Sequence, residues 1–433
     1  MIRPLCTTAL AAAALGATGA LALAAADSDI VWETVETAEP VEAGAGAGTA
    51  GTTEAAAPVK LLVSADRIYT AAGDPIDGGT IAIAGSKIAA VVPGAAGSDD
   101  ALHVAAITPG MVDLSPRIHL ADLSVEESAE VVAHLDTAIG ADLFDDRWDG
   151  LLASGVTTVM YNPADEACVG GLLTVMKTGG EESLAARAVE RDVALRGAFG
   201  VHASRGNRPV FGSPSTHFSR RPTTRMGTEW VHRKTFYDAL YAMDDEARRF
   251  DGWAEIASVL RGERPYIVQA SATQDIRTAI YLKEEFGFPN LVVDAAAEAW
   301  KEPQLLARSG TAAVLPPHAP QGRTAIDNGF LAFNTAKVLT DLGVPVALSS
   351  HGRSDLTGSL AAQAGYAMRG GLTRAEALAA VTLTPARLAG VDDRVGSIEV
   401  GKDADLVLWS GEPFAATSRV LGVVLNGEVH LAD

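Results

Sequence analysis

The sequence predicts an α/β protein: an eight-stranded parallel barrel with β-rich segments at both ends of the chain. Between residues 107 and 389, short apolar strand patterns alternate with amphipathic helical patterns, which is the order that a parallel barrel requires. Before and after this stretch, short β-prone runs are separated by closely spaced turn signals. The 433 residues, 48% of them hydrophobic, suffice for a large core and a second, smaller one.

The first 58 residues are expected to lie outside the folded part. Residues 1–26 have the pattern of a secretory signal peptide: Arg3, an apolar run rich in Ala and Leu, and small residues before Asp27. This pattern predicts export to a periplasmic or extracytoplasmic location, with an uncleaved membrane anchor as the alternative. Residues 27–58 are rich in Ala, Gly and acidic residues, so we predict a disordered linker that cannot offset its ordering entropy.

Residues 59–106 and 390–433 predict two small β segments. The first contains short strand patterns separated by turns near residues 72–75 and 84–86. The second ends with apolar runs on both sides of Asn426-Gly427, a strong hairpin signal.

The central region, residues 107–389, predicts the barrel. Several of its strand patterns are continuous apolar runs, as expected for strands that are buried on both faces. We predict strands at 107–114, 156–162, 172–177, 193–199, 266–270, 291–295, 312–315 and 346–350. We predict helices at 126–139, 234–249, 274–286, 325–342, 359–369 and 374–388.

Charge and cysteine content exclude some classes of function. A net charge of −20 argues against nucleic acid and anionic membrane surfaces as partners. Of the two cysteines, Cys6 lies in the predicted signal peptide, so the mature chain would keep only Cys168 and have no internal disulfide.

Several motifs resemble the amidohydrolase superfamily. Residues 109–113, Pro-Gly-Met-Val-Asp, are similar to its first barrel strand, where such a run precedes a His-x-His pair. Residues 155–159 with Gly170-Gly171 resemble its imidazolonepropionase-like members, and the Gly-Lys-Asp-Ala-Asp-Leu-Val run at 401–407 is close to the pattern of the superfamily. The resemblance implies a (β/α)8 barrel inserted in a composite β-sandwich, split between the two terminal segments. It also implies hydrolysis of C–N or related bonds with one or two divalent metals.

The residue types that hold the metal in this family are replaced in this chain. The six positions that match the family ligands and the catalytic Asp are Ser115, Arg117, Arg196, Gln269, Ala295 and His351. Two are arginines, which stay cationic at any working pH and would repel a metal ion. We therefore expect no metal cofactor at these positions.

Two interpretations keep a chemical role for the site. His119, His318 and His351 could converge on a metal such as zinc at the ends of barrel strands. Alternatively, His351 could be a catalytic base without a metal. In that case Asp355 or Asp294 would orient His351, and Ser115 or Ser350 would be the nucleophile.

A third interpretation is binding without catalysis, with Arg117, Arg196 and Gln269 forming a pocket for an anionic or carboxylate-bearing molecule. Taken together, the sequence predicts a degenerate, metal-free amidohydrolase relative with low or no activity. It would be a ligand-binding protein or the non-catalytic partner subunit of an active paralogue. The alternative is a hydrolase of C–N bonds other than peptide bonds, with a cyclic amide, imidazolone-type or dipeptide substrate. Both predict a small-molecule ligand and a homo- or hetero-oligomer.

Overall fold

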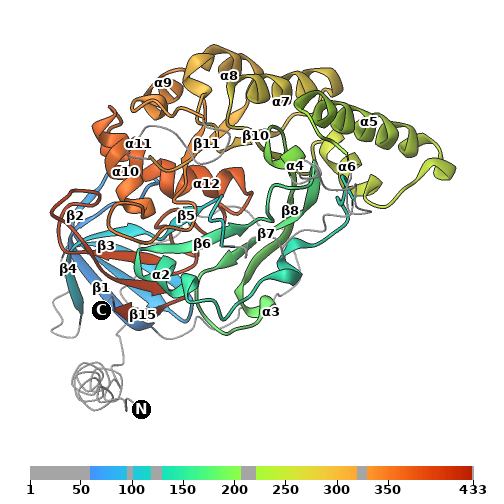
Figure 1. Ribbon diagram of the computed structural model, residues 1–433. Helices are drawn as coiled ribbons and strands as arrows, with labels where there is room; N and C mark the ends of the chain where they lie inside the picture. Colours follow the sequence, from blue (N-terminus) through green and yellow to red (C-terminus); the bar gives the residue numbers. More distant parts are fainter. Residues whose placement is uncertain (1–58, 95–100, 119–128, 206–220, 319–328, 432–433) are drawn as a thin grey trace, which may run out of the picture.

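A computed structural model describes residues 59–94, 101–118, 129–205, 221–318 and 329–431. The signal peptide and linker predicted for residues 1–58 lie outside these ranges, as does His119. Figure 1 shows a β-rich end that contains both termini of the described chain, next to a larger α/β part.

One seven-stranded sheet unites the two ends of the chain. Its order is β15-β14-β13-β4-β1-β2-β3. The central strand β4 (Leu102–Pro109) runs parallel to β1 and antiparallel to β13. The other strands are β1 (Val59–Ile68), β2 (Ile76–Ala84), β3 (Lys87–Pro93), β13 (Leu406–Trp409), β14 (Val420–Leu425) and β15 (Glu428–Leu431). The predicted pairing of the two terminal segments is therefore present, whereas a two-layered sandwich stays a prediction.

A second, eight-stranded sheet curls into a nearly closed barrel. Its strands neighbour each other in chain order, with β5 and β12 at the two ends. Apolar side chains such as Val112, Ile267 and Val292 form one cluster in its interior. The strands are β5 (Met111–Asp113), β6 (Val156–Tyr161), β7 (Val169–Lys177), β8 (Ala188–Ala198), β9 (Tyr266–Gln269), β10 (Leu291–Asp294), β11 (Ala312–Leu315) and β12 (Val346–Leu348).

The predicted all-parallel order of the barrel is wrong at its third strand. β7 runs antiparallel to both β6 and β8. Only residues 162–168 join β6 to β7, and a parallel crossover needs a dozen residues or more. The short connection therefore reverses the chain, and residues 162–168 cross the carboxyl end of the barrel.

The strand predicted at 107–114 is divided between the two sheets. Ile107 and Thr108 belong to β4, and Met111 begins β5 of the barrel. Gly110 lies where the chain passes from the seven-stranded sheet to the barrel. A Cβ atom at this position would be 2.1 Å from the Thr157 hydroxyl of β6. A glycine is needed there because the backbone passes directly beside β6.

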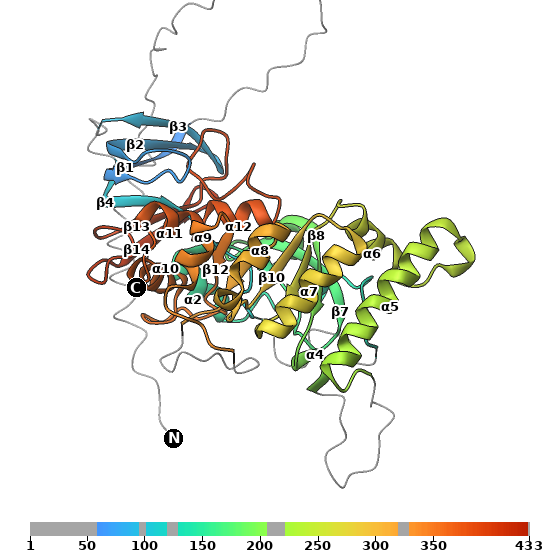
Figure 2. The ribbon, with the colours of Figure 1, turned by 90° about the horizontal axis from the view of Figure 1, so that it is seen from above.

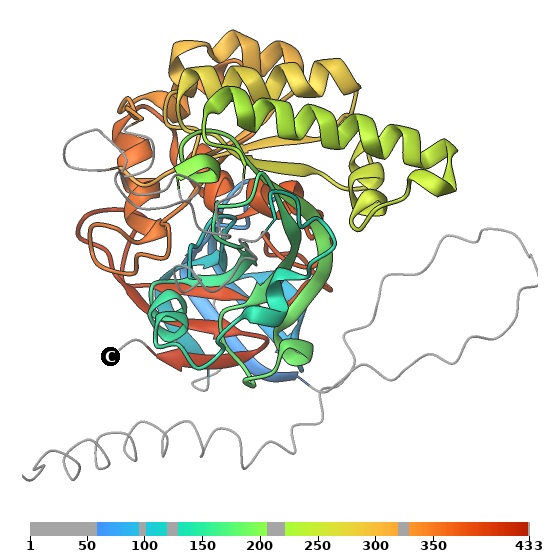
Figure 3. The ribbon, with the colours of Figure 1, turned by 45° about the vertical axis from the view of Figure 1, so that its right-hand side comes forward.

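Helices cover the outside of the barrel. They are α2 (Arg147–Ala153), α3 (Leu184–Arg187), α4 (His202–Arg205), α5 (Arg225–Asp244), α6 (Trp253–Leu260), α7 (Thr273–Phe286), α8 (Pro303–Ser309), α9 (Thr335–Asp341), α10 (Leu360–Arg369), α11 (Arg374–Val381) and α12 (Leu383–Leu388). In Figure 2 the seven-stranded sheet lies at one end and α5 at the other. Figure 3 shows α5, α7 and α8, coloured from yellow-green to gold, side by side.

The helix predicted at 126–139 is wrong over its described part. Residues 131–136 instead lie along β7, with bridges from Val131 to Val169 and from Asp136 to Leu172, and a 3-10 turn at Thr137–Gly140 follows. Gly171 allows this contact, because a Cβ atom there would be 2.2 Å from the Leu135 carbonyl oxygen. Within the described ranges, no helix has the length and apolar character of a membrane-spanning segment.

Candidate functional site

Side-chain hydrogen bonds join β5 to β12, the two end strands of the barrel. The Asp113 carboxylate accepts from the Ser350 amide at 2.9 Å and from the Ser350 hydroxyl at 2.8 Å. It also accepts from the Ser115 amide at 2.9 Å, and the Ser349 hydroxyl donates to the Ser115 carbonyl at 2.8 Å. Burial raises the pKa of Asp113, although these hydrogen bonds oppose the rise. Asp113 therefore links the two end strands of the nearly closed barrel.

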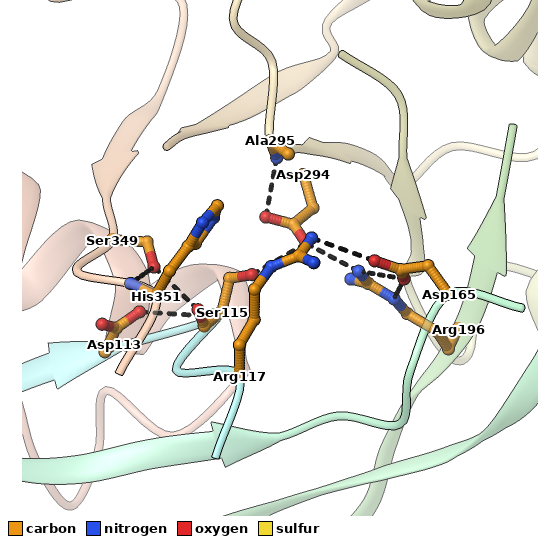
Figure 4. Close-up of polar contacts among 9 residues, drawn as sticks. All are labelled: Asp113, Ser115, Arg117, Asp165, Arg196, Asp294, Ala295, Ser349 and His351. Atoms are coloured by element: carbon orange, nitrogen blue, oxygen red, sulfur yellow. Dashed lines mark hydrogen bonds and ion pairs between the residues drawn. The ribbon is translucent and has the colours of Figure 1, made fainter. Parts of the chain in front are cut away.

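A buried ionic network lies beside this junction (Figure 4). Arg196 of β8 donates from Nε and Nη2 to Asp165 Oδ1, at 2.9 and 2.6 Å, and from Nη2 to Asp294 Oδ2, at 2.7 Å. Arg117 Nη2 donates to Asp165 Oδ2 at 2.9 Å. The Ser115 hydroxyl donates to Asp294 Oδ2, also at 2.9 Å. The network is therefore continuous from Ser115 to Arg117.

The backbone explains why Arg196 points into the barrel. Ala194 belongs to the interior cluster, and side chains two residues apart on a strand share a face. Gly170 of β7 leaves room for the Arg196 side chain, because a Cβ atom there would be 3.3 Å from Arg196 Cβ. The reversed β7 brings Asp165, in the 162–168 connection, to the same end of the barrel.

Arg196 is a permanent cation in this setting. Burial alone would lower its pKa, but the attraction of Asp165 and Asp294 outweighs burial and raises the pKa above the ordinary arginine value. The side chains of Arg196, Asp165 and Asp294 are all almost fully buried. Removing one partner from such a group is strongly unfavourable, because the others keep their charge in a dry site.

Gln269, the last residue of β9, is fully buried and lies in register with Asp294. Its side chain faces the interior, two residues after Ile267 of the interior cluster. Neither Oε1 nor Nε2 of Gln269 has a hydrogen-bond partner in the described structure, and neither does Nη1 of Arg196. Buried polar atoms are nearly always paired, so these atoms are candidates for contact with an ordered water or a ligand.

Ala295 and His351 have positive φ angles of 55° and 50°. The Ala295 amide donates to Asp294 Oδ1 at 2.7 Å, and the His351 amide donates to the Ser349 hydroxyl at 3.0 Å. Ala295 therefore fixes the Asp294 carboxylate through its backbone.

The structure does not bring Asp355 to His351. The Asp355 side chain is about half exposed and accepts from Arg353, Thr357 and Gly358 of its own turn. Hydrogen bonds from Thr357, with those of Arg353 and Gly358, lower the pKa of Asp355 to about 2. The predicted orienting role of Asp355 therefore has no contact to support it.

His318 follows β11, and its ring lies against Phe333 and Tyr366, with centroids 5.3 and 5.9 Å apart. Its amide donates to Gln363 Oε1 at 2.8 Å, and burial lowers the pKa of its ring. Because His119 lies outside the described ranges, the predicted three-histidine site is not tested.

The described residues do not fit a divalent metal. Among them, no group of three or more His, Cys, Asp or Glu side chains is arranged to hold an ion. The carboxylates nearest to the altered ligand positions, Asp165 and Asp294, are both bonded to Arg196. A guanidinium nitrogen thus takes the place between them that a metal ion would need.

Sequence analysis did not identify Asp165 or Ser349 as site residues. The shortness of the 162–168 segment was a usable signal, because it predicts a reversed strand and a carboxylate at the barrel mouth. Ser349 is linked to Ser115 through a contact that spans 234 positions, which no local pattern reveals.

Comparisons with known proteins agree with this architecture. The model of the Amidohydrolase family matches residues 304–430. Amidohydrolase tasK of Hapsidospora irregularis is 24% identical over 366 residues, which cover 76% of this chain but only 36% of that protein. Imidazolonepropionase of Brucella suis is 26% identical over 349 residues, or 71% of this chain and 78% of the enzyme.

Among solved structures, an amidohydrolase from Thermotoga maritima MSB8 is similar, with a TM-score of 0.73 and 29% sequence identity. The similarity covers 86% of this chain and 99% of that one. It therefore includes the composite sheet and the barrel together. The chain belongs to the amidohydrolase superfamily.

Proposed function

We propose that this protein binds a small molecule at the carboxyl end of its barrel without a divalent metal, and that metal-dependent hydrolysis is lost or greatly reduced. One observation carries the proposal: Arg196 Nη2 lies 2.6 Å from Asp165 Oδ1 and 2.7 Å from Asp294 Oδ2. The guanidinium supplies the positive charge that these carboxylates require. A metal ion would have to displace it.

Displacement of Arg196 by a metal is unfavourable for two reasons. The guanidinium cannot lose its proton, so it would remain a buried cation without its partners. Breaking a buried ion pair of this kind costs about 3–5 kcal/mol. The free energy of metal binding to the two carboxylates would have to exceed this cost before the site could bind an ion.

The location supports ligand binding. In barrels of this type, the ends of the strands and the loops that follow them form the functional face. Arg196, Gln269 and Asp294 lie at or near the ends of three successive strands. Such a site also suits a non-catalytic subunit that works beside an active amidohydrolase paralogue.

Metal analysis tests the proposal. Protein purified without chelators should contain zinc, manganese and iron only at substoichiometric levels, and calorimetric titration with Zn²⁺ should give no saturable site near the barrel. Stoichiometric metal that is lost in Asp294→Asn but kept in the exposed-site control Asp238→Asn would overturn it.

A second candidate is a hydrolase of C–N bonds other than peptide bonds, with a cyclic amide, imidazolone-type or dipeptide substrate. Similarity to imidazolonepropionase favours it. Ser115, His351 or a zinc ion held by histidines would then carry the chemistry. Turnover of cyclic amides or dipeptides that is abolished in both His351→Ala and Ser115→Ala would support this candidate against the first.

A further inference from the structure

We propose that α5 forms a two-fold symmetric, antiparallel contact with α5 of a second copy of this chain. The contact would be made by an outer stripe of four large side chains, Met226, Trp230, Tyr237 and Tyr241. In Figures 2 and 3, α5 lies along the outer edge of the barrel, so the stripe is separate from the ionic network at the barrel mouth. The proposal does not depend on the proposed function.

The outer face of α5 is apolar at positions where a surface helix usually carries polar residues. Buried residues such as Phe236 form the inner face of the helix. On the outer face, the exposed fractions are 78% for Met226, 47% for Trp230, 40% for Tyr237 and 55% for Tyr241. Side chains four and seven residues apart share one side of a helix, so these four form one continuous stripe.

The composition and size of the stripe are typical of a protein interface. Trp, Tyr and Met are enriched in interfaces and provide most of their binding hot spots. A large side chain offers roughly 200 Å² of surface, so four half-exposed ones provide about 400 Å². An exposed patch of this size often marks an interaction site.

A neighbouring helix enlarges the patch. Tyr281 of α7 is 50% exposed and lies one helical turn before Glu285. The Glu285 carboxylate accepts from Arg233 Nη2 at 2.7 Å and from the Tyr237 hydroxyl at 2.8 Å, which places this part of α7 against the stripe. Tyr281 raises the apolar area to about 500 Å², and the polar rim supplies the rest of the roughly 800 Å² that a stable dimer buries per copy.

The spacing of the stripe identifies the occupant as a second copy. The intervals between its four residues are four, seven and four, which read the same in both directions along the helix. A two-fold axis at the centre of the stripe therefore brings Met226 opposite Tyr241 of the second copy, and Trp230 opposite Tyr237. Isologous contacts require this self-complementarity, whereas a contact with an unrelated partner does not.

The charged residues at the centre of α5 are compatible with this contact. Arg233 is paired with Glu285, and Lys234 is paired with Asp238. Each copy therefore brings ion pairs to the axis instead of unpaired cations. Such exposed pairs are weak, so they can rearrange at the rim at little cost in free energy.

Sedimentation equilibrium of the full-length protein tests the proposal. We expect a species with twice the mass of the chain. Trp230→Glu should raise the dissociation constant of the dimer about thirtyfold or more, as the loss of an interface hot spot does. Met226→Glu, at the most exposed position of the stripe, should act in the same direction without affecting the fold. The control Phe144→Glu, just before α2, changes an equally exposed side chain outside the stripe and should leave the dimer unchanged.

Disulfide formation tests the register. A mixture of Met226→Cys chains and Tyr241→Cys chains should form a disulfide between the two chains under mild oxidation. Met226→Cys chains alone should not, because two copies of position 226 would lie about 22 Å apart along antiparallel helices. The native Cys168 is buried and serves as the background in the wild-type protein.

Each outcome decides one part of the proposal. A monomeric wild-type protein overturns it, as does a dimer that both Trp230→Glu and Met226→Glu leave intact. A dimer that both changes disrupt, but in which positions 226 and 241 do not crosslink, overturns the antiparallel register. A monomer that binds an amidohydrolase paralogue through the stripe overturns the second copy as the occupant. The metal content of the protein affects none of these results, so they are distinguishable from a failure of the proposed function.

Discussion

Replacement of Arg196 by methionine is the most informative single change. It keeps an unbranched side chain in the barrel but removes the cation between Asp165 and Asp294. The buried Asp294 carboxylate then loses the cation it pairs with, and Asp165 keeps Arg117, so we expect a loss of about 3–5 kcal/mol in the free energy of unfolding at pH 7. The comparison change is Arg233→Met, because Arg233 is about half exposed and pairs with Glu285 at 2.7 Å. Exposed pairs contribute only about 0–1 kcal/mol.

The pH dependence of the Arg196→Met defect identifies its cause. Without the guanidinium, burial and the neighbouring Asp165 carboxylate disfavour the charged form of Asp294. The folded-state pKa of that carboxyl group in the variant should therefore lie above the unfolded value. Groups with a raised folded pKa stabilise the protein at low pH and lose that contribution as pH rises. Urea unfolding at pH 5 and pH 7 should therefore show the smaller defect at pH 5. A defect below about 1 kcal/mol at both pH values would refute the role of the network.

The same variant also tests the competition between guanidinium and metal. In the wild type, Asp165 Oδ1 and Asp294 Oδ2 lie 2.6 and 2.7 Å from Arg196 Nη2, slightly longer than calcium–oxygen bonds of roughly 2.3–2.6 Å, so removal of the guanidinium should leave a position for an ion between them. Mn²⁺ or Ca²⁺ should raise the melting temperature of the variant and leave the wild-type protein unchanged. At a hundredfold excess over Kd, the gain would be about 2.7 kcal/mol. Equal effects of metal on both proteins would show that Arg196 does not exclude the ion.

Three further changes test the rest of the structure. Because burial raises the folded pKa of Asp113, its contribution to stability is present at low pH and is lost as pH rises above the unfolded value. Asp113→Asn should therefore flatten the stability profile between about pH 4 and pH 8, and an unchanged profile would contradict the assignment. Gly171→Ala should cost about 1–3 kcal/mol or more in urea unfolding, because the new methyl group meets a backbone oxygen at 2.2 Å; Gly73→Ala, with open space around it, should be nearly neutral. Lys177→Met should cost about 3–5 kcal/mol, because the buried Asp405 carboxylate loses the cation it pairs with, although Asp403 keeps Lys87 and Arg394. An unchanged melting temperature would show that this contact is dispensable.

Local patterns were sufficient to predict most elements of the fold. Strands such as β9 and β10 are short apolar runs between polar turns, and the Asn426-Gly427 hairpin is a purely local signal. The 131–136 segment was predicted as helical because its apolar residues also fit the spacing of a helix. Only its contact with Gly171 distinguishes the extended segment from a helix. The direction of β7 depends on the length of its connections, a property that strand patterns do not include.

The site was predictable only in part, because its chemistry depends on which charged side chains form ion pairs in the folded chain. Residue identity correctly placed Arg196, Gln269 and Asp294 at strand ends. It could not show that Asp165 pairs with both arginines, since these contacts join residues 48 and 31 positions apart through the reversal at β7. The two arginines predicted to bind an anion are thus already paired with carboxylates of the same chain.

The network also ties the ends of several barrel strands to one another. Here Asp294 of β10, Arg196 of β8, Asp165 of the β6–β7 connection and Ser115 after β5 are tied by hydrogen bonds of 2.6–2.9 Å. Arg196 therefore serves as an internal cross-link, and any ligand must bind beside it, because displacing it would release the ends of the strands that form the site.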